Sequence, residues 1–258
     1  MNLYLHLRQA QRQRVSDGRV CPIFSTISGY DCLLVLIWPQ LGDFDSLEYA
    51  WWLQREHTRL QAAKIKICAV GIGDRAAGQK FCDYTGFPAA SLWVDPTAQL
   101  HQDLELYAGL QVAIPGLSPG VKAWTNLLLM CAGLGSPGTL KEVFRGYRGD
   151  KHAPQLIGPE ETVKAGPLPP LTGSVFNAAG GSGFQRPFEL ATLRLRNMTE
   201  VLSHWSTYVS DPAYLTQRGA TFLFDAQGER LYEHRDRGIL GFAENMSEPL
   251  SFLWAMAN

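Results

Sequence analysis

The sequence lacks any paired cysteine motif. Its five cysteines are an odd number, and no two of them stand in a C-x-x-C arrangement. A secreted disulfide framework uses an even set, and zinc or dithiol motifs bring two cysteines close together in sequence. The cysteines therefore favour a reducing compartment, and we expect a cytoplasmic protein.

An excess of charge of either sign is also missing, as are long apolar runs. The chain has 23 Lys and Arg against 24 Asp and Glu, a net charge of -1. Without a positive excess, no nucleic-acid partner is expected. No uninterrupted apolar run approaches about 18 residues, and the N-terminus lacks the hydrophobic region of a signal peptide. We therefore expect a soluble protein with no integral membrane segment.

The spacing required for common metal or serine chemistry is absent too. No serine lies in a G-x-S-x-G turn, and the histidines show no metal-ligand spacing. We therefore predict no metal site and no cofactor. The histidines considered are His57, His101, His152, His204 and His234.

What the sequence does contain is a strand, a loop and a helix near residue 40. Residues 32–38 form a continuous apolar run, which predicts a strand buried on both faces. Ser46 is predicted to be the N-cap of the helix that follows. Side chains in such a loop lie at the positive end of the helix, which stabilises thiolates and anions. The loop 40–46 is therefore the first candidate site. The residues predicted to share one helix face are Tyr49, Ala50, Leu53, His57 and Leu60.

Strand and helix patterns alternate along much of the chain. The alternation predicts an α/β fold with a mixed sheet and helices on both faces. The predicted strands are 20–27, 32–38, 65–71, 91–94 and a hairpin of 220–225 with 230–234; the predicted helices lie within 1–18 and at 46–60, 74–84, 98–107 and 242–256.

Residues 109–217 interrupt this alternation. They contain two predicted helices, 122–132 and 188–205, and a segment rich in proline and glycine, 133–183, that is predicted to be mostly loop. Neither end carries a flexible polar linker, so we expect one domain over 1–258 with a large helical and loop insertion. The two helices are apolar enough that we expect them to pack together as a lobe beside the sheet.

Several stretches are similar in amino-acid sequence to a known family. They are VLIWPQLG, AVGIGD, LWVDP followed by LYAGL, and RGATFLFDAQGERLYEHRDRG. With these stretches the chain resembles the AhpC/TSA peroxiredoxin-like family, in particular the branch of the mammalian peroxiredoxin-like 2 proteins and their relatives in photosynthetic lineages. The resemblance covers roughly residues 20–110 and 215–257. It implies a thioredoxin-like fold of the peroxiredoxin type and an antioxidant or other redox role. It also implies the plastid stroma as a location if the source is a photosynthetic eukaryote.

The resemblance also indicates where the chemistry of active relatives lies. They carry Gly-Cys-x-x-Cys between the strand and the helix, and the helix N-terminus activates the first cysteine. Here Asp43 stands at the first cysteine position and Ser46 at the second. A degenerate active site is therefore expected, and no residue is assigned as catalytic. The chain is then expected to act as an interaction, assembly or redox-associated module with a protein partner, in an unknown oligomeric state. From the residues alone, Asp43 and Asp45 are explained as helix caps.

The alternative is a working thiol peroxidase or oxidoreductase that uses a cysteine outside the motif. Cys82 is the candidate, because Lys80 is near and the surrounding stretch is polar. Cys82 can also be interpreted as a structural residue that packs as a small apolar side chain. Cys32, Cys68 and Cys131 lie in apolar segments and are predicted to be core residues.

Two further stretches are similar to functional motifs but match them only in part. Residues 71–76, followed by Asp95, resemble a dinucleotide-binding fingerprint, but they are also explained as a turn and an N-cap. Asp43 and Asp45 have the spacing of the acidic pair of phosphatases, although residues 39–42 separate them from the strand.

Overall fold

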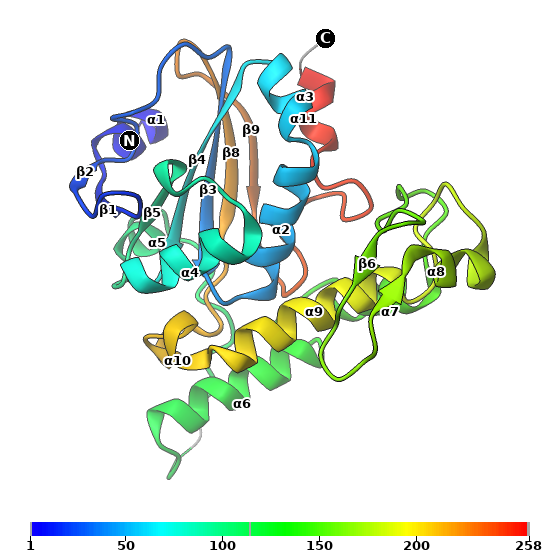
Figure 1. Cartoon of the computed structure of the whole chain (residues 1–258). Coiled ribbons are helices and arrows are strands. Elements are labelled where there is room, and N and C mark those ends of the chain that lie inside the picture. The colour runs from blue at the N-terminus through cyan, green and yellow to red at the C-terminus, as the bar shows by residue number, and fades with distance from the viewer. Residues whose placement is uncertain (1, 114, 257–258) are drawn as a thin grey trace.

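A seven-stranded mixed sheet forms the centre of the molecule (Figure 1). The computed structural model describes residues 2–113 and 115–256. β3 pairs in parallel with β4 and antiparallel with β8, and β4 pairs in parallel with β5. The predicted single sheet and the α/β fold are therefore confirmed. In spatial order the strands are β2 (Val20–Pro22), β1 (Gln11–Arg14), β5 (Leu92–Val94), β4 (Ile65–Ile72), β3 (Cys32–Gln40), β8 (Ala220–Asp225) and β9 (Arg230–Arg235).

Helices cover both faces of this sheet. Alternate residues of β3 point to opposite faces, and each set is buried in a separate hydrophobic cluster. This explains why β3 is continuously apolar in sequence. One face carries α2 (Phe44–Arg55), α3 (His57–Ala62), α4 (Arg75–Thr85) and α11 (Ser251–Met256); the other carries α1 (Leu3–Gln9) and α5 (Gln99–Asp103).

The ends of several elements differ from the prediction. α1 ends at Gln9, and β1 follows where a longer helix was expected. β1 is polar because it lies towards the edge of the sheet, where Arg12 forms an ion pair with Asp95. The predicted strand 20–27 shortens to β2, and the predicted closing helix shortens to α11. His57, predicted to share the apolar face of the helix after β3, is exposed because that helix breaks at Glu56 into α2 and α3.

The inserted segment is more helical than predicted. Two helices, α7 and α8, lie in the stretch that was expected to be loop. Neither buries a regular row of apolar side chains, so neither shows the helical pattern in sequence. The elements are α6 (Pro119–Cys131), α7 (Thr139–Arg148), β6 (Thr162–Val163), β7 (Leu171–Thr172), α8 (Gly173–Gly180), α9 (Glu189–Ser203) and α10 (Trp205–Tyr208), with short 3-10 helices at Ala89–Ser91 and Pro212–Tyr214.

This segment lies across one end of the sheet rather than beside it. Figure 1 shows α6, α9 and α10 below the end at which β3 leads into α2. Arg194 on α9 donates to Glu48 on α2 at 2.7 Å, and the stacked rings of Trp124 and Trp205 connect α6 with α10. α6 runs alongside α9 in Figure 1. Among the described residues, no helix is long and apolar enough to cross a membrane.

Candidate functional site

The loop after β3 brings Asp43 and Ser46 to the first turn of α2. Asp43, and not Ser46 as predicted, is the N-cap: its Oδ1 accepts from the backbone N–H of Asp45 at 2.9 Å. The fully buried Ser46 hydroxyl donates back to the carbonyl of Gln40 at 3.1 Å. The helix starts earlier than the sequence indicated because Asp43 is the first residue after the turn whose side chain reaches the free N–H groups.

Gly42 lets this loop approach the inserted segment closely. A Cβ at this position would lie 2.7 Å from Cβ of Tyr208 and 3.4 Å from a methyl of Val201. Those two residues belong to α10 and α9. The end of β3 is therefore packed directly beneath the insertion, where only glycine fits without moving Tyr208.

A buried arginine joins both aspartates of the loop. Arg218, which is fully buried, donates to Oδ2 of Asp43 at 2.5 Å and lies 3.3 Å from Oδ2 of Asp45. Both oxygens of Asp45 also accept from the backbone N–H of Leu240, at 2.8 and 2.9 Å. Asp43 is a helix cap as predicted, but Asp45 is not: it belongs to a buried ion pair that fastens the start of α2 to the segments around β8 and β9.

Burial and neighbouring charges set the protonation of this cluster. Burial, with the Asp43 carboxylate adding to it, raises the pKa of Asp45, and Arg218 opposes the rise. For Arg218, burial alone would lower the pKa, but the carboxylates of Asp43 and Asp45 raise it. Burial also raises the pKa of the neighbouring Asp236 to about 6, against the pull of His234 and Arg218. The guanidinium is therefore the fixed charge around which the carboxylates are arranged.

Every carboxylate oxygen of the two aspartates already accepts a hydrogen bond. Asp43 uses one oxygen for the helix cap and the other for Arg218, and both oxygens of Asp45 are engaged with Leu240. The Ser46 hydroxyl proton is committed to a backbone carbonyl, and its side chain has no exposed surface. The described geometry thus provides no activated nucleophile and no free general base at this loop.

An apolar groove opens beside this loop. It consists of two hollows of about 280 and 580 Å³ that share Phe44, Cys131, Met198 and Ile239, so they form one continuous surface. Asp43 and Gln40 are at its deep end next to α2. We call this surface the apolar groove. Its walls are formed by α6 with Trp124, Leu127 and Leu128, by α7 with Val143 and Tyr147, and by α9 and its flanks with Phe188, Leu195, Met198, Leu202 and Trp205.

The cysteines are not placed for thiol chemistry at the loop. All five carry free thiols. Cys82 is only 7% exposed, and burial, with Asp83 adding to it, raises its pKa to about 12. Burial also raises the pKa values of Cys32 and Cys68. Cys131 was predicted to be a core residue, but it is exposed in the apolar groove.

The thiol of Cys131 is the one that lies near the start of α2. Burial of the thiol, together with the Asp43 carboxylate, raises its pKa, so the thiolate is disfavoured there. No local pattern indicates this neighbourhood, because Cys131 lies in the insertion and Asp43 lies before it.

The dinucleotide-like motif is explained by packing. A Cβ on Gly71 would lie 2.4 Å from the side chain of Leu41, so this glycine makes room for the loop after β3. Asp74 caps α4 by accepting from Ala77 N at 2.8 Å. Asp95, in the place of a ribose-binding carboxylate, is held by Arg12 at 2.8 Å. Among the described residues, no group of histidines, cysteines and carboxylates could hold a metal ion.

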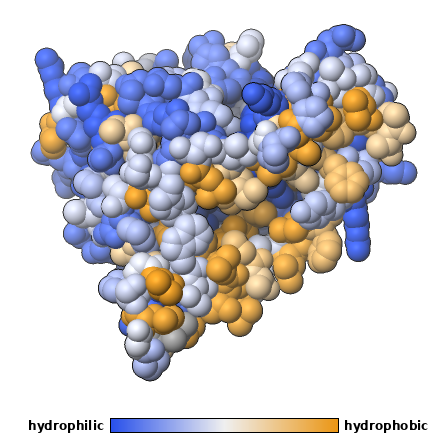
Figure 2. Space-filling view, turned by 60° about the horizontal axis from the view of Figure 1, so that its bottom comes forward, coloured by the Kyte–Doolittle hydropathy of each residue, from blue (hydrophilic) through white to orange (hydrophobic). Residues whose placement is uncertain are grey.

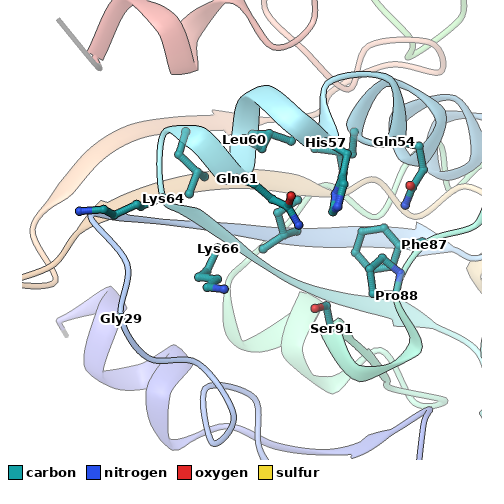
Figure 3. Close-up of a pocket in the computed structure, with 13 residues that line it drawn as sticks. Gly29, Gln54, His57, Leu60, Gln61, Lys64, Lys66, Phe87, Pro88 and Ser91 are labelled. Atoms are coloured by element: carbon teal, nitrogen blue, oxygen red, sulfur yellow. The ribbon is translucent and has the colours of Figure 1, made fainter.

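A separate hollow, of about 370 Å³, lies at the end of β4 that is away from the apolar groove (Figure 3). Gln54 and His57 extend into it from the junction of α2 and α3, facing Phe87 and Pro88. It adjoins the first residues of β4, whereas ligands of open α/β sheets bind beyond the carboxyl ends of the strands. Gln54 is already engaged with the carbonyl of Gly86 at 2.9 Å, so this hollow offers no assembled site.

Sequence reasoning missed Arg218 and Asp236. Both flank the hairpin of β8 and β9, and both are buried beneath the loop that was the first candidate site. One available signal was Arg218-Gly219 directly before an apolar strand, where a charged residue must be paired if it is buried.

Comparison with known proteins gives one result. A sequence model described as AhpC/TSA antioxidant enzyme matches residues 52–238, well over half of the chain. The match begins after both Asp43 and Ser46 and includes the insertion, for which the sequence resemblance had no counterpart. No curated protein matches the sequence. The family match agrees with the mixed sheet and its flanking helices, so the fold is the thioredoxin-like α/β fold, and the chain belongs to the AhpC/TSA antioxidant enzyme family.

Proposed function

We propose that this chain is an AhpC/TSA family protein that has lost thiol peroxidase chemistry and acts by binding, as an interaction or assembly module. The observation that carries the proposal is Asp43. The resemblance assigns this position to the first family cysteine, and here it is a helix cap in an ion pair with Arg218. A carboxylate cannot pass through the sulfenate and disulfide states that a peroxidatic cysteine uses.

The remaining thiols support the same proposal. A peroxidase needs an accessible thiolate, because the thiolate is the nucleophile. Cys82, the alternative redox residue, is buried and has a pKa of about 12, so almost none of it is ionised at neutral pH. Cys131 is accessible, but its pKa is raised as well. Neither of these two thiols combines exposure with a lowered pKa.

The binding half of the proposal is supported by the apolar groove. The largest contiguous apolar patch on the surface of a monomeric protein is often a functional interaction site. Figure 2 shows a continuous band of apolar side chains across the face formed by the insertion. Such a surface fits a protein partner, and the free cysteines fit the reducing cytoplasm or plastid stroma as the place of action.

The test is a peroxide-reduction assay with thioredoxin and with glutathione as the reductant. We expect turnover no faster than that of the same mixture without the protein, which serves as the background. Turnover well above this background would overturn the proposal. If Cys82→Ser alone abolished it, the alternative peroxidase that uses Cys82 would replace the proposal; if Cys131→Ser did so, the thiol in the groove would be the reactive one.

A further inference from the structure

α9 carries two separate rows of apolar side chains. Leu190, Leu193 and Val201 are buried against the rest of the molecule. On the other side, Leu195, Met198 and Leu202 form a row at i, i+3 and i+7, in which Leu202 is 54% exposed. A helix with one apolar side packed on the protein normally carries polar residues on the rest of its surface. One side of α9 therefore lacks its cover in the single chain.

α6 repeats this arrangement. Met130 is fully buried on its inner side, while Val121, Trp124 and Leu128 form an outward row at i, i+3 and i+7, in which Leu128 is 62% exposed. Lys122 is the one charged residue in the 13 residues of α6. A helix with so few charges is suited to burial and not to solvent.

α7 adds to the same face because its polarity is inverted. Glu142 is buried and paired with Arg145 at 2.6 Å and with Arg194 at 2.7 Å. The apolar side chains Phe144 and Tyr147 are exposed instead, and Tyr147 lines the groove. This helix therefore buries a paired charge and exposes the apolar ring of Tyr147 to the groove.

We propose that the occupant of the apolar groove is α6 of a second copy of this chain, so that α6 and α9 of each protomer pack on α9 and α6 of the other as a four-helix bundle. The proposal rests on the proposed function and names the partner. A groove between two helices accepts a helix with apolar anchors at i, i+3 and i+7. α6 itself presents such anchors at Val121, Trp124 and Leu128. The chain thus supplies both the groove and the helix that fills it.

Symmetry and charge agree with a second copy. A two-fold arrangement uses the same surface on both protomers and closes at two, so no further chain is added. Antiparallel α6 helices would place the two Lys122 side chains at opposite ends of the contact, because Lys122 lies near the start of the helix. No like charges would then face each other along α6.

The size of the surface predicts how tight the contact is. α6 and α9 have 13 and 15 residues, so each is about 20 Å long at 1.5 Å per residue. With helix axes about 10 Å apart, two helices present a flat face on the order of 400 Å² before the relief of the side chains is counted. Standard interfaces bury about 800 Å² per partner. We therefore expect a dimer that dissociates on dilution.

The test is sedimentation equilibrium of the full chain over a wide range of concentration. We expect a reversible monomer–dimer equilibrium that shifts to monomer in Leu128→Glu and in Leu202→Glu. Leu5→Glu is the matched control, because Leu5 lies on α1 and is 49% exposed but is outside the groove. A wild type that is monomeric at every concentration, or a Leu128→Glu variant that dimerises like the wild type, would overturn the proposal.

Mixing two variants tests the pairing of α6 with α9. Leu128→Glu and Met198→Lys should each be monomeric alone. In the mixture, one contact would bring Glu against Lys and the other would keep the native pair, so heterodimers should form. A mixture that stays monomeric would contradict the placement of α6 in the partner's groove.

A measurement on the wild type needs no variant to fold. Cys131 lies in the groove, so its labelling by a maleimide should slow as the protein concentration rises. A labelling rate that is independent of concentration would oppose the proposal. The outcome is separable from the proposed function: a monomer without peroxidase turnover would remove the second copy and leave that function standing, whereas turnover would remove that function whatever the assembly state.

Discussion

Arg218 donates to Asp43 at 2.5 Å across 175 positions of sequence. The bond joins the N-terminus of α2 to the segment that enters β8, and Asp45 completes a triad with the same guanidinium at 3.3 Å. In a thiol-dependent relative, a guanidinium at this place would stabilise a thiolate. In this chain it lies against the carboxylates of Asp43 and Asp45.

The first prediction concerns removal of this arginine. Arg218→Met should lower the free energy of unfolding by about 3–5 kcal/mol at neutral pH, because the buried carboxylate of Asp45 and the partly buried carboxylate of Asp43 lose their counter-charge. Chemical denaturation measures the change. In an Asp43→Asn, Asp45→Asn background the same substitution should cost much less, since no charge is then left uncompensated. An equal cost in both backgrounds would show that Arg218 acts through packing alone.

The second prediction concerns a thiol placed at the cap. Asp43→Cys should yield a thiol with a lowered pKa, because it would lie at the helix N-terminus beside Arg218. We expect it to react with a small alkylating reagent at neutral pH roughly tenfold faster than an ordinary exposed cysteine. Ser46→Cys is the matched control and should be inert, because Ser46 has no exposed surface. Slow reaction of Asp43→Cys would mean that the insertion shields this position or that Arg218 does not lower the pKa of a thiol there.

The third prediction is a pH dependence set by His101. This histidine is fully buried and hydrogen-bonded to the carbonyl of Trp38 at 2.9 Å, and burial lowers its pKa to about 4. Below about pH 6.5 the unfolded chain takes up a proton that the folded chain refuses. The contribution of neutral His101 to the free energy of unfolding is therefore fully present above about pH 6.5. It is lost as the pH falls towards 4, by about 3 kcal/mol in total.

In His101→Gln the free energy of unfolding should fall less steeply as the pH is lowered from about 6.5 to 4. Unfolding by denaturant at a series of pH values measures it, with the exposed His57 changed to Gln as the control. If both variants keep the slope of the wild type, His101 is not the group responsible.

The fourth prediction tests whether the insertion and the sheet form one cooperative unit. Glu189 and Arg186 are fully buried and paired at 2.6 Å, and Glu189 also accepts from the backbone N–H groups of Leu156 and Ile157. Glu189→Ala should destabilise the chain by about 3–5 kcal/mol because Arg186 and these donors lose their partner. With one domain, hydrogen exchange in β3 and in α9 should accelerate together. Acceleration confined to 109–217 would indicate two separate units.

The sheet was predictable from sequence for a physical reason. β3 and β4 are covered on both faces, so nearly every side chain had to be apolar, and the resulting runs were visible without other information. Asp74 and Gly86 bracket α4 as cap residues do, so its ends were predictable as well.

The missed elements share a different property. β1 is short and polar, and the buried side of α7 consists of Thr139, Glu142 and Gly146, so neither shows an inward apolar pattern. The ion pair of Arg218 with Asp43 escaped for another reason, since local patterns carry no information on partners 175 positions apart. The apolar groove likewise arises from helices that meet only in three dimensions.

The position of β3 has a consequence for synthesis on the ribosome. β3 lies inside the sheet, between β4 and β8, yet β8 belongs to the last fifth of the chain. At about 5–20 residues per second, the fully apolar edge of β3 stays unpaired for on the order of ten seconds or longer while the insertion is being translated. During this interval the nascent chain exposes its most aggregation-prone strand, so its yield in the cell should depend on chaperones that hold the emerging chain more strongly than the stability of the finished fold suggests.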